Sequence, residues 1–125
     1  MEIADVYRAQ GRPRRALATL DRVNETTTPD NRPPRLEYLQ GLALQAMGRH
    51  GDALEFFEMA RKNDDHPDIL LRIAEAHLAV GQIEQARATA QLFTSSRPGD
   101  QRIASVMNQI QQFNNRLNGA ISSAY

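Results

Sequence analysis

Residues 46–54 read AMGRHGDAL, and this short stretch decides the fold because it occurs three times in related form. The related copies are AQGRPRRAL at residues 9–17 and AVGQIEQAR at residues 79–87. In every copy an alanine follows a glycine by five positions, and the copies start 37 and then 33 residues apart. A period of this size is typical of arrays in which one small unit stacks on the next. We therefore predict a repetitive architecture.

The shared glycines and alanines have a simple physical explanation. Glycine adopts the left-handed conformation that often ends a helix, because it has no Cβ atom to clash. Pro13 suits the first turn of the following helix, where its missing N–H group costs nothing. A small alanine early in that helix lets two helices approach closely. Each unit is therefore predicted to be a helix, a tight turn at Gly11, Gly48 or Gly81, and a second helix that contains Ala16, Ala53 or Ala86.

The spacing of apolar residues extends this prediction along the chain. Helices are expected at about residues 2–10, 13–24, 35–47, 50–63, 67–80, 82–96 and 100–117. Pro67 is expected in a first helical turn and Asp100 as an N-cap. The polar, proline-rich stretch 24–34 is predicted to be a loop, which explains the longer first period. In the last helix one face is expected to carry Ile103, Val106, Met107, Ile110, Phe113 and Leu117.

Three units in register resemble the tetratricopeptide repeat, a helix-turn-helix unit of about 34 residues. The family's pattern sets small residues, aromatic residues and a glycine at fixed positions. The first unit matches it with Ala4, Tyr7, Gly11, Ala16, Leu20 and Val23. The second matches with Gly41, Leu44, Gly48, Ala53, Phe57 and Ala60. The third matches with Ala74, His77, Gly81, Ala86, Ala90, Phe93 and Pro98.

The third unit departs from the second in one informative way. It carries Ala90 and then Phe93, where the second unit carries Phe57 and then Ala60. We expect Phe93 to fill space against the last helix, through Val106 or Met107. In addition, no unit has the large aromatic residue that the family often shows early in its first helix.

The resemblance implies an all-α fold, an α-solenoid of antiparallel helical hairpins with about seven helices. A single domain is expected at 1–118, with repeats at about 1–30, 34–65 and 66–99 and a capping helix at 100–117. Residues 119–125 are predicted to be a flexible tail. The first unit lacks the start of its first helix, so an open apolar edge is expected there. Missing upstream repeats, or a second copy of the chain in a homo-oligomer, would cover that edge.

Composition and motifs argue against catalysis. The chain has 125 residues, no cysteine, and 15 basic against 15 acidic residues, so thiol chemistry is excluded and a polybasic surface is not expected. The three histidines lack metal-ligand spacing, and His77 is expected in the core or an interface. The acidic stretch 64–68 is expected to provide turn and cap oxygens and not a cation site. We therefore predict no enzyme, no cofactor and no metal.

Two polar stretches each admit two interpretations. The run of basic residues 12–15 is interpreted as a solvated helix start, because the total charge is balanced; contact with an anion or a nucleic acid is the alternative. The amide-rich last helix is interpreted as the polar outer face of a cap, and hydrogen bonding to a bound peptide backbone is the alternative. Its amides are Asn108, Gln109, Gln111, Gln112, Asn114 and Asn115.

The resemblance also implies where a partner binds. The first helix of each tetratricopeptide unit lines a concave groove, which can take an extended or helical peptide. The groove positions fall on Tyr38, Leu42, Gln45, Leu71, Arg72, Glu75, Leu78, Asn108, Gln111 and Gln112. The alternative for the leucines among them is that they only pack within the solenoid.

One specialised form of groove binding is not expected. Chaperone-binding members of the family clamp a peptide's C-terminal carboxylate with Lys, Asn and Arg side chains. Here Arg72 matches such a position, whereas the others carry Met1, Asp5, Leu39 and Asp68. Two of these are acidic and would repel a carboxylate, so we predict no binding of that kind.

The function expected from the sequence is a scaffold that binds a protein or peptide in its groove. The alternative is an accessory or oligomerisation domain cut from a larger enzyme or from a secretion or envelope-assembly protein. Neither nucleic-acid binding nor membrane binding is expected. A cytoplasmic location is expected by default, because the sequence has no signal peptide and no apolar run long enough to span a membrane.

Overall fold

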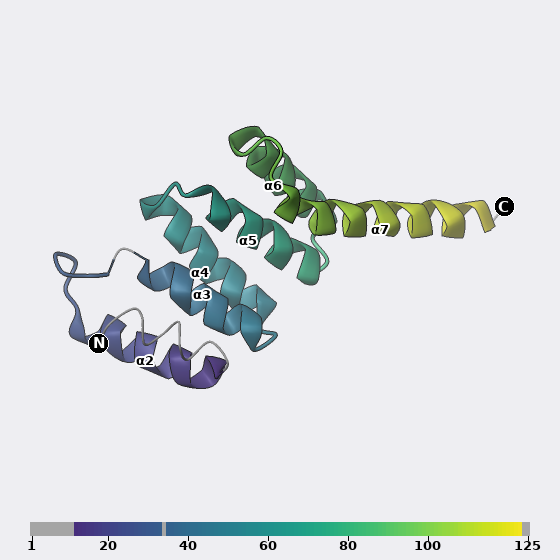
Figure 1. Ribbon diagram of the computed structural model, residues 1–125. Coiled ribbons are helices and arrows are strands. Elements are labelled where there is room, and N and C mark those ends of the chain that lie inside the picture. The colour runs from purple at the N-terminus through teal and green to yellow at the C-terminus, as the bar shows by residue number, and fades with distance from the viewer. Residues whose placement is uncertain (1–11, 34, 124–125) are drawn as a thin grey trace.

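The computed structural model describes residues 12–33 and 35–123, and every regular element in this part is helical (Figure 1). The elements are α2 (Pro13–Thr26), α3 (Leu36–Ala46), α4 (His50–Asn63), α5 (Pro67–Ala79), α6 (Ile83–Ser96), the 3-10 turn η2 (Gln101–Ile103) and α7 (Ala104–Ser123). The all-α prediction is confirmed, and the described helix boundaries up to α6 lie within two residues of those expected. The helix expected at 2–10, with the turn at Gly11, falls outside the described residues.

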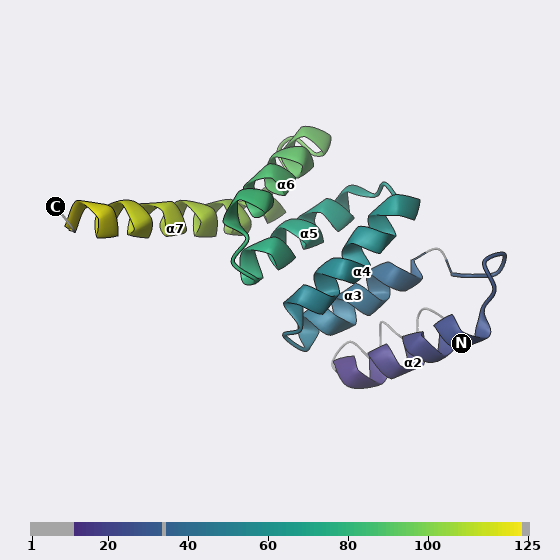
Figure 2. The same cartoon turned by 180° about the vertical axis from the view of Figure 1, so that it is seen from behind.

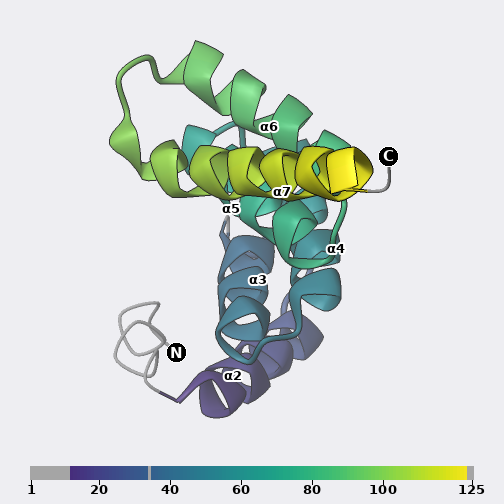
Figure 3. The same ribbon diagram turned by 90° about the vertical axis from the view of Figure 1, so that its right-hand side faces the viewer.

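The helices stack in chain order as hairpins. α3 packs on α2 and α4, and α5 packs on α4 and α6, so each hairpin is covered by its neighbours (Figures 1 and 2). α7 follows the same order and packs on α5 and α6 (Figure 3). This is the α-solenoid predicted from the repeat, in which stability comes from each unit and from the interface to the next.

The tight turns form where the glycines predict them. Gly48 has a φ of 78° and Gly81 a φ of 83°, the left-handed conformation that few other residues adopt. The N–H of Arg49 donates to the carbonyl of Leu44, and the N–H of Gln82 donates in the same way to the carbonyl of His77. These bonds satisfy the last free carbonyls of α3 and α5 and end both helices.

Small residues set the spacing between the helices of a hairpin. Ala53 and Ala86 have no exposed surface, as expected for positions where two helices meet closely. Gly41 has the same role on α3, because a Cβ atom there would lie 2.5 Å from Cε1 of Phe57. The fully buried ring of Phe57 therefore packs directly on the backbone of α3.

The C-terminal part differs from the prediction. α7 continues to Ser123 and does not end at 117, so the predicted tail from 119 is helical as far as that residue. Asp100 is an N-cap as expected: its side chain accepts a hydrogen bond from the N–H of Arg102. Phe93 packs with Val106, as one of the two expected contacts, whereas Met107 remains 38% exposed.

None of the described helices is both long enough and apolar enough to cross a membrane.

Candidate partner-binding face

Two hollows lie on one side of the solenoid and meet at Gln45. We call this side the inner face. The first hollow, of about 280 Å³, is lined by Pro13, Ala16, Leu39, Leu42, Ala43, Gln45, Ala46 and Arg72. The second, of about 240 Å³, is lined by Gln45, His50, Glu75, Leu78, Ala79, Ser105, Val106 and Gln109. α3, α5 and α7 provide most of these residues. In the second and third units the lining residues lie mainly on the first helix, whereas in the first unit Pro13 and Ala16 lie on the second helix, α2.

Arg72 is the principal charged group of the inner face. Its Nη1 lies 3.0 Å from Oε1 of Glu75, one turn along α5. Burial lowers the pKa of Arg72, but the Tyr38 hydroxyl and the Glu75 carboxylate outweigh this effect and leave the pKa above its usual value. Arg72 therefore stays charged. Its ion pair with Glu75 lies within α5 and does not connect two helices.

Two buried nitrogen atoms at the hollows have no hydrogen-bond partner among the described residues. They are Nε of Arg72, beside the first hollow, and Nδ1 of His50, beside the second. A buried polar atom without a partner costs stability unless a ligand or water satisfies it. Nε of Arg72 can only donate and is fully buried, so the part of Arg72 that a ligand can reach is the exposed remainder of its side chain, which is 32% exposed overall.

Half of the residues predicted to contact a partner line the hollows. These are Leu42, Gln45, Arg72, Glu75 and Leu78. Leu42 and Leu78 also pack against buried core residues, so the alternative of packing within the solenoid holds for both, although they line the hollows as well.

Two other predicted residues are part of the core. Tyr38 is 5% exposed and packs against the ring of Phe57, with the ring centroids 5.9 Å apart. The guanidinium of Arg35 covers the ring of Tyr38 at 4.3 Å. Leu71 is 4% exposed and belongs to the cluster that joins α5, α6 and α7. Neither side chain is open to a partner.

The three residues predicted on α7 do not line the hollows. Asn108, Gln111 and Gln112 are exposed elsewhere on the helix. Ser105 and Gln109 reach the second hollow instead and are joined by a 3.2 Å hydrogen bond. The signal was present in the sequence, because these two flank the apolar stripe at a spacing of four, on the side that faces α5.

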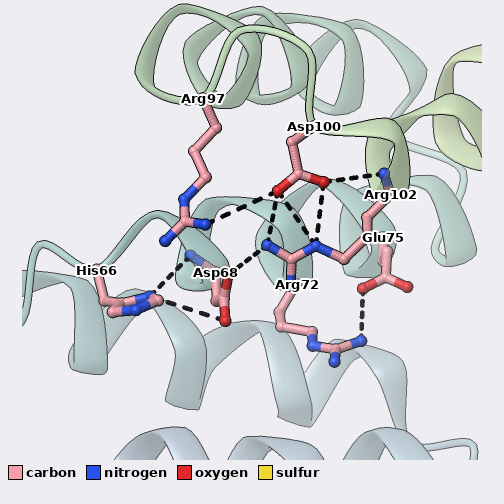
Figure 4. A network of polar contacts seen from close by, with 7 residues as sticks. All are labelled: His66, Asp68, Arg72, Glu75, Arg97, Asp100 and Arg102. Carbon is pink, nitrogen blue, oxygen red and sulfur yellow. Dashed lines mark hydrogen bonds and ion pairs between the residues drawn. The ribbon is translucent and has the colours of Figure 1, made fainter.

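An ion-pair network beside the inner face joins α5 to the turn before α7 (Figure 4). The guanidinium of Arg102 lies between two carboxylates, 2.7 Å from Asp68 and 2.8 Å from Asp100. Hydrogen bonding to Arg102 lowers the pKa of Asp68, and it lowers that of Asp100 to about 2. Asp68 and Arg102 are 34 residues apart in sequence, so the contact fixes the position of the last helix.

Two of the three histidines, His66 and His77, and the acidic stretch 64–68 have structural partners. Nδ1 of His66 accepts the N–H of Asp68 and caps α5, so the predicted cap uses a ring nitrogen and not a carboxylate oxygen. Asp64 accepts the N–H of His66 in the turn before it. His77 is half-buried, with Nδ1 2.6 Å from the side-chain oxygen of Gln82. The contacts of Asp64, His66 and Asp68 lie in the connection between α4 and α5, and that of His77 lies in the turn between α5 and α6.

A third hollow gathers the basic residues at the start of α2. It has a volume of about 620 Å³ and is lined by Arg12, Pro13, Arg14, Arg15, Met47 and Arg49. Arg49 forms an ion pair with Asp52 at 2.7 Å, but the ion pairs of the described residues include none with the other three arginines. This basic hollow shares Pro13 with the first hollow of the inner face. The run is exposed, as predicted, and it adjoins the inner face.

Comparison with known families agrees with this geometry. A family model described as tetratricopeptide repeat matches residues 44–110, and a second model with the same description matches residues 4–22. The chain belongs to the tetratricopeptide repeat family. No curated protein and no solved structure matches it. Tetratricopeptide repeats generally mediate interactions between proteins and are typically not catalytic.

Proposed function

We propose that this tetratricopeptide protein is a scaffold that binds a peptide segment of another protein along its inner face. The observation that carries the proposal is the pair of hollows that meet at Gln45. The wall of the first hollow is largely apolar, with Leu39 and Leu42. The wall of the second hollow is mostly polar, with Leu78 among polar side chains such as Glu75 and Gln109. Partly apolar hollows with a few fixed polar groups are typical of sites that take a side chain and orient its backbone.

The polar groups suggest how the peptide is held. Arg72 lines the first hollow and its side chain is 32% exposed, so its guanidinium donors suit a backbone carbonyl of the ligand. Gln45, Ser105 and Gln109 both donate and accept, which suits an extended backbone that offers both kinds of group. An apolar side chain of the ligand would occupy the first hollow, next to Leu42.

The basic hollow would make the scaffold prefer ligand peptides of a particular charge. An apolar anchor in the first hollow places the neighbouring ligand residues near Pro13, and hence near Arg12, Arg14 and Arg15. Charge complementarity then favours acidic residues on that side of the anchor. The exposed arginines would act mainly on the association rate, and salt would weaken their effect.

The direct test uses peptides selected from a random library displayed on phage, with the whole chain as bait. Gln45→Trp fills the junction of the two hollows, so we expect it to weaken the selected peptides at least tenfold in fluorescence anisotropy. Gln91→Trp is the matched control, because Gln91 is exposed on α6, which lines neither hollow. Equal loss in both variants, or loss in neither, would exclude the inner face as the site.

A further inference from the structure

The apolar stripe of the last helix continues past the body of the protein. Its residues are spaced by three and four positions, at Ile103, Val106, Ile110, Phe113 and Leu117. The first three are at most 8% exposed, whereas Phe113 is 44% and Leu117 is 50% exposed. Figures 1 and 2 show the reason: the C-terminal half of α7 projects away from α5 and α6. The same face is therefore covered at one end and open at the other.

The covered end shows what this face does. Val106 and Ile110 pack with Ala90 and Phe93 of α6 in one buried cluster. Phe113 and Leu117 extend that interface with the alternating spacing of three and four that lets one helix pack along another. Phe113 and Leu117 form an exposed apolar patch that is continuous with a buried interface, and contiguous apolar patches mark interaction sites. The geometry of the stripe calls for a second helix in the place that α6 leaves empty.

The residues beside the stripe indicate which helix fits. Between Ala104 and Gly119 the only charged residue is Arg116, and the remaining polar residues are serine, asparagine and glutamine. When a surface meets its own copy, each residue lies near its equivalents, so charged flanks would repel. Carboxamides both donate and accept hydrogen bonds and can pair with copies of themselves. A flank made mostly of amides is thus compatible with self-pairing and offers little to steer a charged partner.

We propose that the projecting half of α7 pairs with the same half of α7 in a second copy of the chain, in antiparallel orientation. The pairing buries Phe113 and Leu117 of both copies. Antiparallel orientation follows from the shape in Figure 1, because it places the two bodies at opposite ends of the helix pair. A parallel pair would bring both bodies to the same end, side by side. The inner face lies on the body and stays accessible, so this pairing is independent of the proposed peptide binding.

The test is the solution mass over a dilution series from micromolar to millimolar, by light scattering after size exclusion. The unchanged chain should approach twice its 14.0 kDa as concentration rises. Phe113→Glu/Leu117→Glu should remain at 14.0 kDa throughout. Leu92→Glu, at a 47% exposed position on α6, is the control and should still dimerise. A monomer at every concentration, or equal dimerisation of the double variant, would overturn the proposal.

Spin labels test the orientation, since the chain has no cysteine of its own. Two single-cysteine variants are needed, Met107→Cys near the body and Asn114→Cys in the projecting half. An antiparallel pair gives a clearly longer distance between the two labels at 107 than between those at 114. Equal distances at the two positions would mean a parallel pair and would contradict the proposed orientation.

Discussion

Gly41→Ala tests the packing that spaces the helices of the second hairpin. The new Cβ would lie 2.5 Å from Cε1 and 2.6 Å from Cδ1 of Phe57, about 0.9 Å short of ordinary van der Waals contact at 3.4 Å. The ring has no exposed surface and no free side toward which to move. Overpacking of this kind costs about 1–3 kcal/mol.

A competing effect has the opposite sign and must be subtracted. Alanine is favoured over glycine inside a helix by about 1 kcal/mol. The net expectation is a loss of about 0–2 kcal/mol in the free energy of unfolding relative to the unchanged chain. For a domain of this size the upper end corresponds to a fall in Tm of roughly 8 °C.

The assay is thermal and urea unfolding followed by circular dichroism at 222 nm, a wavelength that reports helix content. Gly51→Ala is the matched control, because Gly51 lies in α4 and a Cβ there would meet nothing within 4 Å. The control should keep or raise the Tm. Both variants gain the helix preference of alanine, and only Gly41→Ala meets Phe57, so a Tm for Gly41→Ala equal to or above that of Gly51→Ala would refute the close contact between α3 and Phe57.

Two further predictions concern turns and charge. Gly81 has a φ of 83°, so Gly81→Ala should destabilise the fold by about 1–2 kcal/mol although a Cβ would meet no atom within 4 Å. Gly81→Asn should lower the Tm by less, because asparagine adopts this conformation more readily than alanine. Equal Tm values for the two variants would contradict this expectation. Arg102 lowers the pKa values of Asp68 and Asp100, so the stability that these two carboxylates contribute is complete above the ordinary pKa of 3.8 and is lost as pH falls below it; the pKa of Asp100 is about 2. Arg102→Gln should therefore lower the urea midpoint at neutral pH and flatten its fall below about pH 4; an unchanged acid profile would mean that the network does not stabilise the fold.

Local sequence signals were sufficient to predict the hairpins. The glycine that ends a helix and the alanine early in the next helix act on neighbouring residues. The turns and helix starts at Gly48, Gly81, Ala53 and Ala86 could therefore be predicted without tertiary information. The same holds for Asp100, whose carboxylate caps the backbone two residues ahead. The extent of α7 was missed because Gly119 follows the apolar stripe as a helix-ending glycine would, yet it lies within the helix, which continues to Ser123.

The inner face was only partly predictable, since it depends on rotation of each helix about its own axis. Tyr38 and Leu71 fall on groove positions of the family pattern, yet in this chain they turn into the core beside Phe57 and Phe93. On α7 the face toward α5 is set by the packing of Val106, which brings Ser105 and Gln109 to the hollow and leaves Asn108 outside. The ion pair of Arg102 with Asp68 required the full stack of α5, α6 and α7.

The measurement that tests the central claim most directly is a titration of the 15N-labelled chain with a selected peptide, followed by NMR. The account predicts that the amide signals that shift most belong to α3 and α5 around Leu42, Gln45, Arg72 and Leu78. Signals on the outer side, in the middle of α4 and α6, should stay in place. Shifts concentrated on α4 and α6, with those four residues unaffected, would contradict binding at the inner face.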